Sequence, residues 1–206
     1  MISSKSKQDH SGYALMTTLF ESIANNWHVW FVTITLIVAA VIDGIKLKVP
    51  NWITFPMIVS GWIYSMVAAS AAGDAWYQGL GASLIGTVVG LALLLPAYAI
   101  GGMGAGDVKL LAGVGAWMHG TCTAYAFACT TVTGAVLAVL MVLYQKAWAK
   151  HRNQFWLIVG EIMTIRNPDQ LSDIAAKRKP SMMLLPYGIP IAIGTILYFA
   201  WMDMLV

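Results

Sequence analysis

Apolar runs about as long as a membrane is thick recur along this chain and restrict what it can fold into. A membrane-crossing helix needs about 20 consecutive apolar residues, because the hydrocarbon core of a bilayer is ~30 Å thick. Hydrophobic residues make up 59% of the 206-residue sequence and charged residues only 10%, whereas a typical soluble domain is about 25% charged. The runs are residues 28–42, 53–72, 79–100, 108–118, 121–144 and 182–201. The sequence therefore predicts an all-α polytopic membrane protein with about six transmembrane helices, in which the short run 108–118 is tilted or crosses only in part.

The segments outside these runs suggest a simple organisation. Residues 1–27 form a polar and amphipathic N-terminal segment, and residues 28–206 are expected to form a single membrane-embedded domain. Within that domain, residues 145–181 are predicted to form a basic cytoplasmic loop. The apolar stretch 155–165 in this loop is too short to cross a bilayer and is expected to form a short helix at the cytoplasmic interface.

Basic residues indicate how the chain is oriented. If the ends of the spans that carry Asp43 and Asp107 share one side, every lysine and arginine except Lys5 and Lys7 falls on that side. Loops rich in lysine and arginine stay in the cytoplasm, so this side is predicted to be cytoplasmic. The basic loop is interleaved with aromatic residues, which favours contact with anionic lipids at the cytoplasmic face over a nucleic-acid partner.

Two aspartates lie at the boundaries of the predicted spans. Asp43 closes the first run, and Asp107 opens the fourth. A carboxylate beside hydrocarbon is costly, so it indicates a functional site. Two carboxylates at the same depth can share a proton, which is the chemistry of an aspartic protease. The alternative for Asp43 is an ordinary acid at a helix end, paired with Lys46 or Lys48.

Glycine and proline mark the surroundings of these acids. The glycine-rich stretch 101–106 permits a sharp turn and the close approach of an extended substrate strand to Asp107, although Gly102 and Gly106 also fit a helix-packing surface. The stretch 186–190, with two prolines and a glycine, predicts a helix break at the depth of the aspartates, or a simple proline kink. Asn51, after Pro50, is expected to cap the second span.

These motifs together resemble a known family. Residues 102–112 are similar to the GxGD signature of type IV prepilin peptidases. Asp43 with residues 49–51 resembles that family's first aspartate motif, and residues 186–188 resemble its C-terminal motif. The resemblance extends from about residue 30 to residue 201, with the three motifs in the family's order.

The resemblance implies an aspartic endopeptidase of the bacterial inner membrane that removes the short leader from pilin-like precursors at the cytoplasmic face. In that family the two motif aspartates form a water-activating dyad, here Asp43 and Asp107. Supporting or substrate-binding roles are then expected for Gly104, Gly106, Lys109, Pro186, Tyr187 and Gly188. For Lys109 the alternative is a lysine whose charge simply reaches the membrane surface.

Larger members of the family carry a cytoplasmic insertion whose paired cysteines bind zinc, and they also methylate the new N-terminus. This chain has no paired-cysteine insertion between its first spans. The resemblance therefore implies no metal or other cofactor and no methyltransferase activity. The compact form is similar to the small peptidases of tight-adherence (Flp/Tad) pilus systems.

Two other functions remain compatible with the residues. One alternative is a non-catalytic membrane subunit of a pilus or secretion assembly, and the other is a small proton- or ion-coupled transporter. Transport sites tend to lie near the bilayer midplane, whereas Asp43 and Asp107 are predicted at its cytoplasmic edge.

Overall fold

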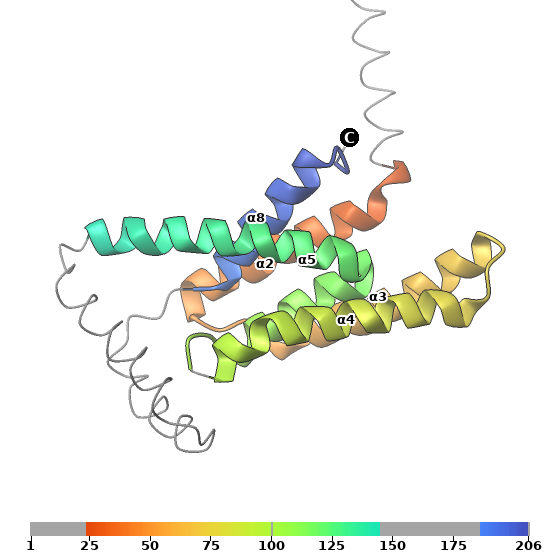
Figure 1. Cartoon of the computed structure of the whole chain (residues 1–206), viewed down its shortest axis with the longest axis horizontal. Helices are drawn as coiled ribbons and strands as arrows, with labels where there is room; N and C mark the ends of the chain where they lie inside the picture. Colours follow the sequence, from red (N-terminus) through yellow and green to blue (C-terminus); the bar gives the residue numbers. More distant parts are fainter. Residues whose placement is uncertain (1–23, 100, 145–185, 206) are drawn as a thin grey trace, which may run out of the picture.

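The protein is a bundle of helices, seen in a computed structural model that describes residues 24–99, 101–144 and 186–205 (Figure 1). The helices are α2 (Trp27–Lys46), α3 (Asn51–Ala71), α4 (Trp76–Ala99), α5 (Ala105–Tyr144) and α8 (Gly188–Trp201). The described residues contain no strand. Helices α2, α3 and α4 and the part Ala105–Met141 of α5 are long and apolar enough to cross a membrane, whereas α8 is shorter. The prediction of an all-α polytopic membrane protein is confirmed, and the count of six spans stays a prediction.

Helix α5 joins the two runs that the sequence predicts as separate spans. Its backbone leaves the helical conformation at His119, where φ is 62° and ψ is 177°. With this ψ, His119 lies outside the left-handed helical region, in a strained conformation that is otherwise found almost only for glycine. The chain reverses direction there, so that residues 105–118 form a first arm and residues 120–144 form a second arm that runs back beside it (Figure 1).

The two arms of α5 pack against different helices. The first arm lies against α3 and α4, where the backbones of Gly115 and Gly86 meet so closely that a side chain on either would overlap the other helix. The second arm packs on α8, where Gly194 lies directly against the backbone of Thr130. Helix α2 packs mainly on α8. Small residues allow this close approach in membranes, where apolar side chains gain little from leaving the lipid.

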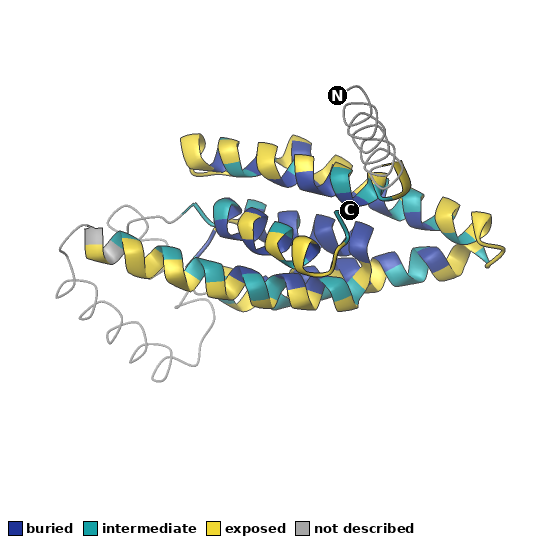
Figure 2. Cartoon of the chain, turned by 90° about the horizontal axis from the view of Figure 1, so that it is seen from above, coloured by how far each residue is buried: buried dark blue, intermediate teal, exposed yellow. Residues whose placement is uncertain are grey.

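The first arm of α5 lies in the centre of the molecule. Leu110, Leu111 and Val114 are fully buried in it. Large apolar side chains such as Ile34 and Ile63 point outward instead, and the outer faces of the helices are largely exposed (Figure 2). In a membrane protein such faces meet lipid, so the arm that carries Asp107 is the part most shielded from it.

Both predicted motif acids lie at the same end of the bundle. Helix α2 ends and α3 begins there, separated by residues 47–50, and α5 and α8 both begin there (Figure 1). Helix α2 continues to Lys46, so Asp43 lies inside its last turn and not beyond it. The predicted loop 145–181, its interfacial helix 155–165 and residues 1–23 lie outside the described residues.

Within the described residues, the C-terminal motif lies at the start of a helix. Tyr187 is the residue before α8, and Pro190 lies in its first turn. Backbone N–H groups in a first turn have no partner within the helix, so the N–H that proline lacks costs nothing there.

Candidate active site

Asp43 is held by the beginning of α8. Its side chain is only 2% exposed, and its Oδ2 accepts a hydrogen bond from the N–H of Gly188 at 2.8 Å. Gly188 is the first residue of α8, where free N–H groups and the helix dipole favour a negative charge. A Cβ at position 188 would lie 2.9 Å from both Cβ and Oδ2 of Asp43. The bare backbone of glycine is therefore needed for this contact.

Asp107 is held by the turn that precedes its own helix. It is the third residue of α5, and its Oδ2 accepts a hydrogen bond from the N–H of Gly104 at 3.1 Å. An acid at this position commonly reaches back to the residue before the helix. The side chain is 5% exposed. Its second oxygen, Oδ1, is buried and has no hydrogen-bond partner among the described residues.

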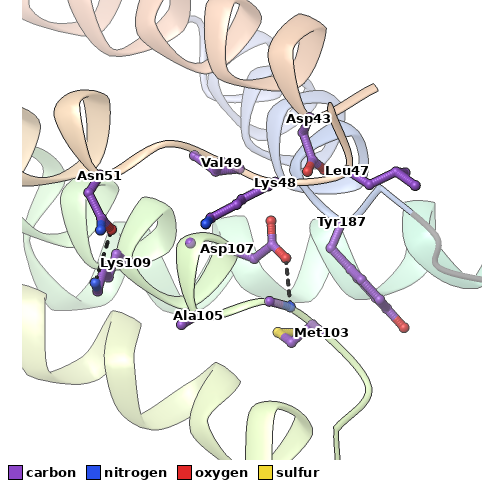
Figure 3. A pocket seen from close by; sticks show the side chains of 12 residues that line it. Asp43, Leu47, Lys48, Val49, Asn51, Met103, Ala105, Asp107, Lys109 and Tyr187 are labelled. Atoms are coloured by element: carbon purple, nitrogen blue, oxygen red, sulfur yellow. Dashed lines mark hydrogen bonds between the residues drawn. The ribbon is translucent and has the colours of Figure 1, made fainter. Parts of the chain in front are cut away.

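The two carboxylates meet at one cavity of about 440 Å³. Asp43 and Asp107 enter it from different helices and face each other across it (Figure 3). No lysine forms an ion pair with either acid in the described part of the chain, so the pairing of Asp43 with Lys46 or Lys48 does not occur there. The structure therefore brings together the two aspartates that the sequence singled out.

Four of the other predicted site residues also line this cavity, namely Gly104, Gly106, Lys109 and Tyr187. Gly106 lies so close to Val49 that a Cβ there would be 2.5 Å from the Val49 carbonyl oxygen. It therefore docks the start of α5 against the turn 47–50. Burial, together with the charge on Asp107, raises the pKa of the Tyr187 phenol.

Lys109 and Pro186 form their hydrogen bonds away from the two aspartates. Lys109 lines the cavity, but its Nζ donates a hydrogen bond to Oδ1 of Asn51 at 3.1 Å. Pro186 is not in contact with the cavity; its carbonyl accepts the N–H of Ile189 at 3.1 Å at the start of α8.

Sequence reasoning missed the part that Asn51 plays. The prediction that Asn51 caps α3 is wrong: the N-cap is Pro50, and Asn51 is the first residue of the helix. Its side chain is engaged by Lys109, which is 58 positions away in the sequence. Lys48, which the sequence suggests only as a partner of Asp43, also lines the cavity. No local pattern in the sequence announces either contact.

The sequence from α2 to the second arm of α5 matches a known protein family. Residues 30–139 match the model of the type IV leader peptidase family. The chain belongs to that family. Both Asp43 and Asp107 lie inside the matched residues, whereas Tyr187 and Gly188 lie outside them.

Curated relatives carry a related name. The chain is 27% identical over 118 residues to a prepilin leader peptidase/N-methyltransferase of Aeromonas salmonicida strain A449, and 26% identical over 118 residues to one of Aeromonas hydrophila. Each match covers 54% of this chain and 38% of the relative. The chain thus matches well under half the length of these relatives. No solved structure matches it.

Proposed function

We propose that this chain is an aspartic endopeptidase that removes the leader peptide from type IV pilin-like precursors. Membership of the type IV leader peptidase family supports leader cleavage. The observation that carries the aspartic mechanism is the pair of buried carboxylates, Asp43 and Asp107, that face one cavity from two helices. Each is held by the N–H of a glycine, which fixes its position without blocking it.

The proposed reaction uses one proton shared between the two acids. Two buried carboxylates that share one cavity do not both ionise readily, so one of them keeps its proton. The ionised acid takes a proton from water as the water oxygen attacks the peptide carbonyl carbon. The protonated acid donates a hydrogen bond to the carbonyl oxygen, and a proton then passes to the leaving amine as the C–N bond breaks. Oδ1 of Asp107, which lacks a partner among the described residues, is available for this exchange.

Charge supports placing the site at the cytoplasmic face of the bacterial inner membrane. The lysines of the described residues, Lys46, Lys48 and Lys109, all lie at the aspartate end of the bundle, and Asp74 lies at the other end. Loops with lysine stay in the cytoplasm. A precursor would dock its apolar helix among the spans of the single membrane domain 28–206, with its polar leader in the cytoplasm. Anionic lipids would contact the basic segment 145–181, and no nucleic acid is involved.

We infer that this chain hydrolyses the leader without methylating the product. The printed names of the Aeromonas relatives include an N-methyltransferase. Here only residues 47–50 separate α2 from α3, which leaves no space for a metal-binding insertion between them. The compact arrangement fits the tight-adherence type of peptidase.

The test is a purified reaction. The chain is reconstituted in liposomes with a pilin precursor from a tight-adherence system, with and without S-adenosylmethionine. The masses of the products are measured by mass spectrometry. A product shortened by its leader and free of an added methyl group is expected. Intact precursors, across several pilins, would favour a non-catalytic assembly subunit. Proton flux without cleavage would favour a transporter.

A further inference from the structure

Leu47 adopts a backbone conformation that leucine rarely takes. It is the residue that follows α2, and its φ of 50° and ψ of 35° lie in the left-handed helical region. Its N–H donates to the carbonyl oxygen of Asp43 at 2.7 Å, which closes the last turn of α2. Helices commonly end on a residue in this conformation, and that residue is usually glycine, because a Cβ lies too close to the following carbonyl oxygen there. Leucine is therefore an unfavourable residue for the backbone at position 47.

The side chain of Leu47 does not offset this cost by packing in the core. It is 52% exposed and lies outside the buried core cluster of the described residues. It lines the cavity that holds Asp43 and Asp107 instead. In Figure 3, Leu47 and Tyr187 lie on one side of the Asp107 carboxylate, and Asn51 lies on the other. Unfavourable backbone conformations cluster at functional sites, where the surrounding structure maintains them.

Contact with lipid does not by itself account for this leucine. Ile45, two positions earlier, is 76% exposed and already presents an apolar side chain outward from the end of α2. It does so inside the helix, without a left-handed backbone. Ile45 does not line the cavity, whereas Leu47 does. What distinguishes Leu47 is thus an apolar surface beside the two acids.

We propose that Leu47 is a specificity-determining residue, whose side chain contacts an apolar residue of the precursor next to the scissile bond. This inference rests on the proposed peptidase reaction. A pilin-like precursor joins a polar leader to an apolar helix, so apolar residues adjoin the cleavage point. Contact between such a residue and Leu47 removes apolar surface of both from water. Because Leu47 is hydrogen-bonded to the backbone of Asp43, this contact places the neighbouring peptide bond beside the acids.

The experiment measures kcat/KM for precursor cleavage in liposomes, and the thermal unfolding midpoint of the same samples. Leu47→Asn and Leu47→Gly remove the apolar side chain and keep the left-handed turn, which asparagine and glycine adopt more readily than leucine. Each should lower kcat/KM by roughly tenfold or more, as expected when a buried leucine contact is lost. The midpoint should not fall. Leu47→Met keeps an apolar side chain of similar volume and should retain most of the activity.

Ile45→Asn is the matched control, because it removes an equally apolar and more exposed side chain that does not line the cavity. It should cleave at the wild-type rate. A loss of cleavage as large as that of Leu47→Asn would show that the end of α2 needs apolar residues only to meet lipid, and would overturn the proposal.

A second series of measurements identifies the residue of the precursor that Leu47 contacts. The three residues on each side of the scissile bond are replaced by serine, one at a time. Replacement at one apolar position should lower kcat/KM for the wild-type chain. The same replacement should lower it much less for Leu47→Asn, because the contact is already lost.

Three further results would overturn the proposal. They are wild-type cleavage by both Leu47→Asn and Leu47→Gly, equal sensitivity of Leu47→Asn and the wild type to every serine replacement, and a lower midpoint that accompanies the loss of cleavage. The last result would mean that the side chain serves the fold. A wild-type chain that cleaves no precursor would instead refute the proposed function on which this inference rests.

Discussion

Replacing Gly188 by alanine should damage the site while leaving the fold intact. The new Cβ would lie 2.9 Å from Cβ and Oδ2 of Asp43 and 3.1 Å from its Cγ. Contacts this short force the carboxylate or the start of α8 to move, which breaks the 2.8 Å hydrogen bond from the Gly188 N–H. Alanine is otherwise favoured over glycine in a helix by up to about 1 kcal/mol, so the backbone itself does not suffer.

The size of the effect follows from the lost bond. A hydrogen bond to a charged group contributes about 1.5–3 kcal/mol. If the bond is needed in the transition state, its loss lowers the cleavage rate roughly 10- to 100-fold, since 1.4 kcal/mol corresponds to a factor of about ten. The thermal unfolding midpoint should fall only modestly, because the preference of the helix for alanine, up to about 1 kcal/mol, offsets part of the lost hydrogen bond.

The assay is the rate of precursor cleavage by the purified variant, with the unfolding midpoint measured on the same sample. Gly81→Ala is the matched control: it is a glycine of another helix, α4, around which a Cβ would meet nothing within 4 Å. The control should cleave at the wild-type rate. The reasoning about Asp43 is wrong if Gly188→Ala also cleaves at that rate.

Three further changes probe the site and the packing beneath it. Gly104→Ala places a Cβ 3.2 Å from Oδ2 of Asp107; because this is the far end of a side chain that can shift, we expect a loss of cleavage rate of roughly tenfold or less. Gly115→Ala would overlap the backbone of Gly86, so the unfolding midpoint should drop, by an amount corresponding to about 1–3 kcal/mol; an unchanged midpoint would contradict the observed helix contact. Tyr187→Phe should leave the alkaline limb of the pH–rate profile in place, since burial and the charge on Asp107 raise the pKa of Tyr187 and keep its phenol neutral in that range; a shifted limb would mean that this phenol titrates there.

Hydropathy was enough to predict the first three described helices and to single out the two acids at the ends of the apolar runs. The runs 28–42, 53–72 and 79–100 match α2, α3 and α4 to within a few residues. The length and hydropathy of a membrane span are properties of one continuous segment, so they can be recognised from the sequence. Asp43 and Asp107 stood out for the same reason, since an acid beside such a run is costly.

Contacts between distant residues could not be predicted in this way. The hydrogen bond from Gly188 to Asp43 joins positions 145 apart, and the single-residue reversal at His119 depends on how two arms pack. Asn51 has the chemistry of a helix cap, and its preference for Lys109 appears only when α3 and α5 are placed side by side. Such choices are set by tertiary packing, which a local pattern does not record.

Cleavage by variants of the two aspartates tests the central claim most directly. Asparagine keeps the size of aspartate and removes the titrating group, so Asp43→Asn and Asp107→Asn should each abolish removal of the leader from a co-expressed precursor. Asp74→Asn, at the opposite end of the bundle, should cleave as the wild type does. Cleavage at the wild-type rate by either site variant would show that the residue is not catalytic and that the two-aspartate mechanism is wrong.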